Sequence, residues 1–223
     1  MIKGIIYDLD DVIIDSYGLH VKATEMVLAE FGVKPGQQKI SDKLEAKLLG
    51  KRVIEVMEIL ARHHKLKVDP RILHQRREEI FLKLAQAELE LFPGVKESLR
   101  LFKAEGFKTA VASSGTKELI NFVLGKFGLF HLFEEIVSAE DVKKGKPDPE
   151  VFKKATGKMG LKPEECVVLD DSTNGIIAAK KAGCKCIAVP SAQTPKQDLS
   201  KADRIVDSLG EITLSIIKQL DGQ

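Results

Sequence analysis

Three carboxylates follow one apolar run near the start of the chain. Residues 5–7 form the apolar run, and Asp8, Asp10 and Asp11 all come within the next four residues. Because like charges at this spacing repel one another, a folded site that keeps them together favours a bound cation. Carboxylate oxygens are the ligands that hard divalent cations prefer. The segment therefore indicates a divalent metal site, with a solvated acidic turn as the alternative.

A second apolar run delivers hydroxyl groups in place of carboxylates. Residues 109–112 are followed by Ser113, Ser114, Gly115 and Thr116, at the point where a helical pattern begins. Hydroxyls and free backbone N–H groups at a helix start can bind an anion. Simple capping of the helix by Thr116 explains the same residues, so both interpretations stay open.

A basic loop and a second acidic pair complete the set. Lys146 lies in the loop 143–148, where a solvated run of lysines is the usual explanation. Asp170 and Asp171 directly follow the apolar residues 167–169. Acidic pairs can hold Mg²⁺, a lysine and a hydroxyl can hold phosphoryl oxygens, and one aspartate remains free to attack phosphorus. The combination predicts phosphate chemistry.

The elements that must position these side chains alternate between strand and helix. The predicted strands are residues 4–9, 108–112, 136–138, 167–169, 186–189 and 204–206. The predicted helices between them are residues 95–105, 117–127, 149–159 and 173–182. Apolar strands that alternate with helices favour a parallel sheet covered on both faces, whose ligands gather at the carboxyl ends of the strands.

One region breaks this alternation. Residues 17–90 contain only helical patterns, such as the apolar stripe of Val53, Val56, Met57 and Leu60. A helical insert directly after the first strand would cover the sheet edge like a lid. We therefore predict an α/β protein with a Rossmann-like parallel sheet core, residues 1–15 and 91–223, and an inserted α-helical cap domain, residues 16–90.

Composition narrows the class of protein. The chain has 223 residues, 43% of them hydrophobic, and its 35 basic and 33 acidic residues give a formal net charge of +2. This mixed charge argues against a nucleic-acid partner. Since no apolar stretch approaches about 20 residues and Met1 leads directly into a strand, we expect no membrane span, no signal peptide and a cytoplasmic protein. The three cysteines are expected to be reduced core residues, and a zinc site is disfavoured.

In this order along the chain, the four segments resemble the four signature motifs of the haloacid dehalogenase superfamily of phosphotransferases. The resemblance covers essentially the whole chain. It implies that Asp8 is the nucleophile that forms an aspartyl phosphate, and that Asp10 is the general acid and base. Ser113 would bind the phosphoryl group, and Lys146 would steady Asp8 and the transferring phosphate.

The same resemblance implies a Mg²⁺ site. Asp170 and Asp171 would complete it together with Asp8, and the main-chain carbonyl of Asp10 would be a further ligand. Asp10 also speaks against dehalogenation, because that branch lacks the second acidic residue of the first motif and needs no metal.

The helical insert resembles the cap of the β-phosphoglucomutase-like and phosphoglycolate-phosphatase-like branch. His20 lies where that branch often has histidine, and Arg52 lies in a segment similar to the substrate-facing loop of the cap. Both would bind the substrate; a helix-surface histidine and a solvent-exposed arginine are the alternatives. Asp11 departs from the glycine common in sugar-phosphate members, and its role is not assigned.

The expected function is magnesium-dependent hydrolysis of a small, sugar-like phosphomonoester by a monomer or weak oligomer. In the second half-reaction, Asp10 would activate the water that hydrolyses the aspartyl phosphate. A phosphosugar mutase of the β-phosphoglucomutase type is the nearest alternative, because it would pass the phosphate from Asp8 back to a sugar hydroxyl. A non-catalytic binding or regulatory protein on the same fold is the more distant one.

Overall fold

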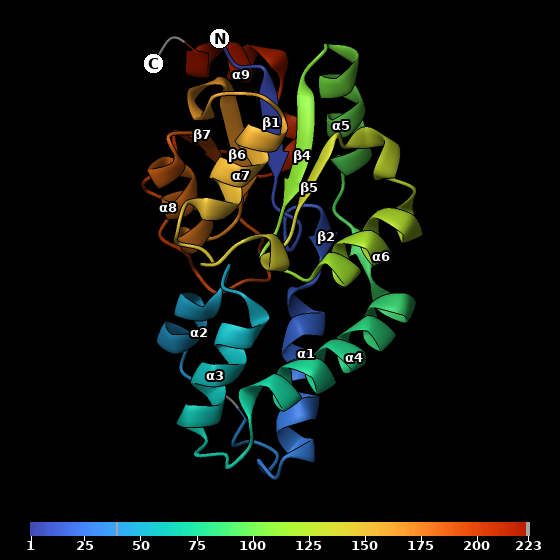
Figure 1. Cartoon of the computed structure of the whole chain (residues 1–223), viewed down its shortest axis with the longest axis vertical. Helices are drawn as coiled ribbons and strands as arrows, with labels where there is room; N and C mark the ends of the chain where they lie inside the picture. Colours follow the sequence, from blue (N-terminus) through green and yellow to red (C-terminus); the bar gives the residue numbers. More distant parts are fainter. Residues whose placement is uncertain (39, 222–223) are drawn as a thin grey trace.

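A parallel six-stranded sheet forms the centre of the computed structural model, which describes residues 1–38 and 40–221. Along the sheet the strands follow the order β5-β4-β1-β6-β7-β8, and every pair is parallel (Figure 1). The strands are β1 (Gly4–Tyr7), β4 (Lys108–Ala112), β5 (Glu135–Val137), β6 (Cys166–Asp170), β7 (Lys185–Ala188) and β8 (Arg204–Ile205). From β1 the chain adds β4 and β5 on one side of the sheet, and then β6, β7 and β8 on the other side. The strand order therefore reverses between β1 and β6, and ligands of open α/β sheets bind at such a switch point.

Helices cover both faces of the sheet because the strands bury side chains in both directions. Ile5 and Tyr7 of β1 belong to one apolar cluster, whereas Ile6 belongs to the other. The first cluster includes residues of α5 (Val95–Ala104), α6 (Lys117–Phe127) and α9 (Leu214–Asp221). The second includes residues of α7 (Glu150–Lys158) and α8 (Thr173–Ala182). The predicted α/β fold is thereby confirmed.

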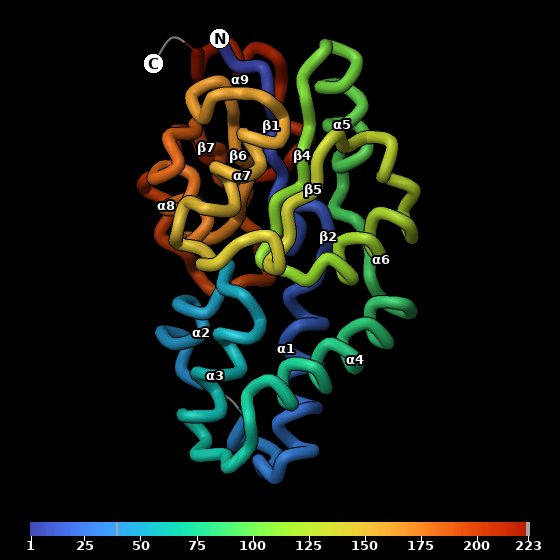
Figure 2. The backbone as a smooth tube through the Cα atoms, viewed as in Figure 1, coloured from blue at the N-terminus to red at the C-terminus, as the bar shows by residue number. Residues whose placement is uncertain are grey.

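Four helices follow β1 and precede α5 in the chain, and they form a separate group beyond the carboxyl ends of the strands (Figure 1). They are α1 (Tyr17–Glu30), α2 (Asp42–Leu48), α3 (Val53–His63) and α4 (Pro70–Glu88). Helix α4 packs against both α1 and α3. Figure 2 shows the N-terminus and helix α9 at the opposite end of the molecule. The division into two domains at residues 15 and 90 stays a prediction.

Two very short strands join this helical insert to the sheet. They are β2 (Ile14–Asp15) and β3 (Glu90–Leu91), which pair in antiparallel fashion. The expectation that residues 17–90 hold no strand is therefore wrong at Glu90. Two-residue strands carry no measurable alternation of polar and apolar residues, so the pattern could not reveal them.

The remaining helical segments are single turns of 3₁₀-helix. They are η1 (Phe130–Leu132), η2 (Ala139–Asp141), η3 (Pro163–Glu165) and η4 (Leu209–Glu211). All three cysteines are buried with free thiols, as expected. Within the described residues, no helix combines the length and the apolar character needed to cross a membrane.

Candidate active site

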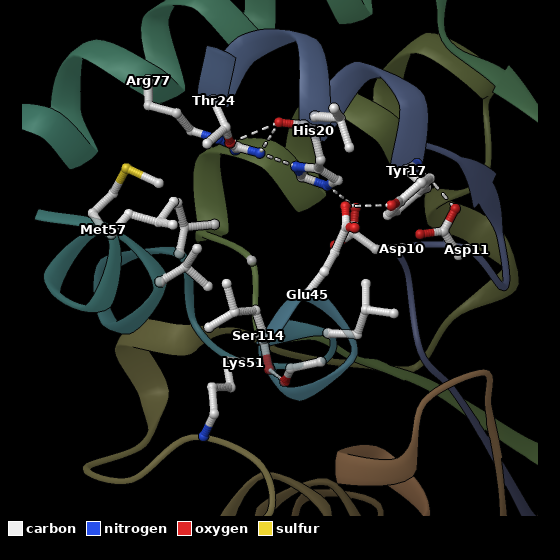
Figure 3. A pocket seen from close by; sticks show the side chains of 18 of the residues that line it. Asp10, Asp11, Tyr17, His20, Thr24, Glu45, Lys51, Met57, Arg77 and Ser114 are labelled. Carbon is white, nitrogen blue, oxygen red and sulfur yellow. Dashed lines mark hydrogen bonds and ion pairs between the residues drawn. The ribbon is translucent and has the colours of Figure 1, made fainter. Parts of the chain in front are cut away.

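A cavity of about 400 Å³ lies where the helical insert meets the carboxyl ends of β1, β4 and β6 (Figure 3). The sheet side contributes Asp8, Asp10, Ser114 and Asp171 among other residues, and the insert contributes side chains of α1 to α4. A volume of this size is within the range of small-molecule sites. Five of the predicted residues at the strand ends therefore line one cavity: Asp8, Asp10, Ser114, Gly115 and Asp171.

Lys146 joins the ends of the two central strands. Its Nζ atom lies 2.8 Å from Oδ1 of Asp8 and 2.8 Å from Oδ2 of Asp170, and its side chain is fully buried. Burial alone would lower the pKa of the Lys146 ammonium, but the charges of Asp170 and Asp8 outweigh it and raise that pKa. Lys146 is therefore a permanent positive charge beside Asp8, and not a solvated lysine.

Three buried carboxylates surround this one ammonium. Oxygen atoms of Asp8, Asp170 and Asp171 all lie within 4.8 Å of one another. Burial raises the pKa of Asp8 to about 7, although the charge of Lys146 opposes the shift. Burial also raises the pKa of Asp171 well above its usual range, and the charge of Asp170 adds to the effect. Because one ammonium does not balance three carboxylates, the donor set fits a divalent cation.

Asp170 is held more tightly by the protein than Asp171. Its Oδ1 atom accepts hydrogen bonds from the backbone N–H and the hydroxyl of Ser172, at 3.0 and 2.8 Å, and its Oδ2 atom accepts one from Lys146. A Cβ atom on Gly175 would lie 2.0 Å from the Asp170 carboxylate, so only glycine allows α8 to begin this close. Asp171, in contrast, lines the cavity.

Asp10 faces the cavity and receives two hydrogen bonds on one oxygen. The hydroxyl of Ser16 lies 2.8 Å and Nε2 of His20 lies 2.7 Å from Oδ1 of Asp10. Burial would raise the pKa of Asp10, but the charge and hydrogen bond of His20, together with Ser16, hold it below its usual range. In this arrangement Asp10 is an ionised carboxylate, as a general base must be.

Arg77 of α4 holds the far side of the His20 ring. Its guanidinium contacts Nδ1 of His20 and also forms an ion pair of 2.8 Å with Glu78. The imidazole stacks on Phe81, with ring centroids 4.2 Å apart. His20 therefore contacts Asp10 from a fixed position and is not a solvent-exposed surface histidine.

Asp11 has a structural role that the sequence left open. Its φ angle is 57°, a left-handed conformation that aspartate tolerates better than most residues. Its Oδ1 atom accepts hydrogen bonds from the backbone N–H groups of Ser16 and Tyr17, at 3.3 and 3.0 Å, and so holds the start of α1. Burial raises the pKa of Asp11 to about 8, and the charge of Asp10 adds to the shift.

The residues after β4 divide between the cavity and the protein interior. Ser114 and Gly115 line the cavity, whereas Ser113 is buried outside its lining and accepts a hydrogen bond from the N–H of Gly115 at 2.9 Å. The Ser114 hydroxyl donates to the carbonyl of Gly50 in the insert, at 2.8 Å. Thr116 caps α6 through the N–H of Leu119, as one interpretation of this segment predicted.

The structure does not bring Arg52 to the cavity. Its Nε atom forms an ion pair of 2.6 Å with Glu55, and the side chain packs beside Gly145 of the core. The neighbouring Lys51 lines the cavity in its place.

Arg77 and the apolar wall of the insert were not found from the sequence. A signal for Arg77 exists, since it lies on the buried face of α4 together with Leu73, Ile80 and Phe81. A charged residue inside an apolar helical stripe is seldom buried without a polar partner.

A parallel α/β sheet, a helical insert and a buried cluster of carboxylates with one lysine at the switch point define a phosphotransfer enzyme. Residues 5–189 match the model of the haloacid dehalogenase-like hydrolases, and the chain belongs to this family.

Similar proteins agree with this assignment. Hexitol phosphatase B of Escherichia coli (strain K12) is 32% identical over 220 residues, 95% of each chain, and YhcW of Bacillus subtilis (strain 168) is 34% identical over 218 residues, 97% of this chain and 96% of that one. The crystal structure of CbbY from Rhodobacter sphaeroides in complex with phosphate matches with a TM-score of 0.85 and 28% identity, over 98% of this chain and 100% of that one. The chain is thus a phosphatase of the family.

Proposed function

We propose that this phosphatase hydrolyses small organic phosphomonoesters in a Mg²⁺-dependent reaction, through an aspartyl phosphate on Asp8. The observation that carries the proposal is the position of Asp8. It follows the central strand at the switch point, contacts the Lys146 ammonium at 2.8 Å and lines the cavity beside Asp171.

The carboxylates of Asp8, Asp170 and Asp171 and the main-chain carbonyl of Asp10 would hold Mg²⁺. When bound, the cation would neutralise the phosphoryl oxygens and keep Asp8 ionised at neutral pH.

Lys146 supplies the remaining positive charge at the site of attack. Asp8 would attack phosphorus while the Lys146 ammonium, 2.8 Å from its carboxylate, offsets the negative charge that builds up on the phosphoryl group. The cavity-lining Ser114 and Gly115, at the start of α6, would bind the phosphoryl oxygens. Ser113, directly before them, would bind the phosphoryl group as well, and its hydroxyl accepts the N–H of Gly115 in this turn.

Asp10 would carry the proton in both half-reactions. A dianionic phosphate beside Asp10 raises the pKa of this carboxyl, so that it takes up a proton which it then gives to the leaving alkoxide. Once the alcohol has left, the ionised Asp10 would activate the water that hydrolyses the aspartyl phosphate. Ser16 and His20 hold Asp10 in place for both steps.

Residues 16–90 would act as a cap domain over the core. Hydrogen bonds already join the two parts, from Ser114 to Gly50 and from Asn174 to the carbonyl of Leu49, at 2.8 and 2.6 Å. Such closure would exclude bulk water from the first half-reaction.

The relatives support a sugar-like substrate. One is named as a phosphatase of hexitols, and a variant of CbbY was solved in complex with xylulose-(1,5)bisphosphate. The proposal is tested by measuring phosphate release from a panel of sugar and polyol phosphates, with Mg²⁺ and with EDTA. We expect release that EDTA abolishes and that Asp8→Asn lacks; equal release in EDTA would contradict it.

A further inference from the structure

We propose that the cavity selects phosphomonoesters whose body carries no second anionic group. The inference rests on the proposed function and names the substrate class within it. The body of the substrate would lie in the part of the cavity beyond Asp10, which the helices of the insert line.

Apolar side chains form most of this wall. They are Val21, Ile40, Leu48, Leu49, Val53, Val56, Met57, Leu60 and Leu119. A phosphate or carboxylate placed against such a surface loses its hydration without gaining hydrogen bonds, which is unfavourable. A sugar or polyol presents C–H faces to the same wall without that cost.

The charged groups of this wall are mainly acidic. Glu25, Asp42 and Glu45 all line the cavity. The carboxylate of Glu45 accepts a hydrogen bond of 2.6 Å from the hydroxyl of Tyr17, which fixes its position. A second anionic group on the substrate would therefore meet like charges.

The positive charges among the described lining residues do not offset this repulsion from the acidic side chains. Arg77 pairs with Glu78 and contacts His20, which in turn contacts Asp10, so its charge is compensated within the wall. Its Nε atom has no hydrogen-bond partner in the described chain, but it is buried and is not exposed to the cavity. Lys51 follows the Gly50 that binds Ser114, and Figure 3 shows its amine pointing away from Arg77 and Met57.

The same wall distinguishes between hydrolase and mutase activity. A phosphosugar mutase passes through a bisphosphate, whose second phosphate must lie in the cavity beyond Asp10. Apolar and acidic walls there disfavour that intermediate, whereas hydrolysis of a monophosphate never forms it. The structure thus favours net hydrolysis.

The test compares two probes that differ in one charge. Phenyl phosphate and 4-carboxyphenyl phosphate have the same ring, and the carboxylate lies opposite the phosphate. We expect kcat/KM for phenyl phosphate to be at least about tenfold higher, as one unfavourable charge contact of about 1.4 kcal/mol requires. Equal values, or a preference for the carboxylate, would overturn the inference.

Variants of the wall locate the selectivity. Val56→Lys adds a cation to the apolar wall. Glu45→Gln removes a negative charge while keeping an acceptor for Tyr17. Both variants should therefore reduce the ratio of kcat/KM for phenyl phosphate to kcat/KM for 4-carboxyphenyl phosphate. Ile54→Lys is the matched control, because Ile54 lies on the same helix but outside the lining. An equal reduction of this ratio in Ile54→Lys would contradict the proposal that the lining residues cause the selectivity. Circular dichroism verifies that each variant is folded.

Two further outcomes separate the inference from the proposed function. Lys39 lies outside the described residues, so Lys39→Ala is measured alongside; a selective loss of 4-carboxyphenyl phosphate turnover in it would overturn the inference alone. If the folded, Mg²⁺-loaded protein released phosphate from neither probe and from no sugar or polyol phosphate, the proposed function would fail, and the inference with it.

Discussion

The Nε2 atom of His20 lies 2.7 Å from Oδ1 of Asp10, so a residue of the helical insert contacts the carboxylate that follows the first strand of the sheet. This contact and the hydroxyl of Ser16 hold the pKa of Asp10 below its usual range despite its burial. The protonation of Asp10 therefore depends on the position of α1.

Replacing this histidine should change the pH dependence of turnover. Loss of the His20 contact in His20→Asn should raise the pKa of Asp10. Since the base must be ionised, the low-pH limb of kcat should move to higher pH. The profile is measured from pH 4 to pH 8, with the exposed His131→Asn as control. A wild-type profile in both variants would show that His20 does not act through Asp10.

Turnover should depend on Lys146 but not on the other lysines of the same loop. Lys146→Ala removes the charge beside Asp8 and should lower kcat by about 100-fold or more. Lys144→Ala is the matched control, because Lys144 is exposed in the same loop. Steady-state kinetics on the folded variants measures kcat. Similar small decreases of kcat in both variants would mean that Lys146 is only a structural residue.

The two acidic residues at the end of β6, Asp170 and Asp171, should have different roles. Asp171→Asn should weaken Mg²⁺ binding by tenfold or more, on the order of one charged ligand. Asp170→Asn should weaken Mg²⁺ binding less than Asp171→Asn does and should also lower kcat at saturating Mg²⁺, because Asp170 holds Lys146 at 2.8 Å. Titration calorimetry with Mg²⁺ and kinetics at high Mg²⁺ separate the two effects. Identical changes in both variants would contradict this division.

The metal-free protein should lose stability as the pH rises. The pKa values of Asp8 and Asp11 are raised to about 7 and about 8, so the folded state binds more protons than the unfolded state between about pH 4 and pH 8. The free energy of unfolding in EDTA should therefore fall across this window, by up to about 1.4 kcal/mol per pH unit for each group.

Chemical denaturation at several pH values checks this sign. Asp171→Asn, which removes a buried negative charge, should flatten the dependence and raise the stability in EDTA, and Mg²⁺ should flatten it in the wild type. A metal-free protein that becomes more stable from pH 6 to pH 8 would contradict the account.

The positions of the strand ends could be predicted from the sequence, because each strand is marked by its own short apolar run. An apolar run such as residues 4–7 predicts a buried strand, and the residues that follow it must lie at the sheet edge. The parallel fold then brings Asp8, Lys146 and Asp171 together, although they are far apart in the chain.

The insert side of the cavity could not be predicted in the same way. Which side chains of a helix face the cavity depends on how α1 to α4 pack on one another, and a period of 3.6 residues does not fix that rotation. The family resemblance indicated Arg52, yet Lys51 lines the cavity and Arg52 pairs with Glu55.

The most direct measurement looks for the covalent intermediate. The protein is mixed with a ³²P-labelled phosphomonoester and Mg²⁺, quenched in acid within milliseconds and analysed by peptide mass spectrometry. The account predicts one hydroxylamine-sensitive acyl phosphate on Asp8, present in the wild type and absent from Asp8→Asn. Label on another residue, or rapid turnover by Asp8→Asn, would contradict it.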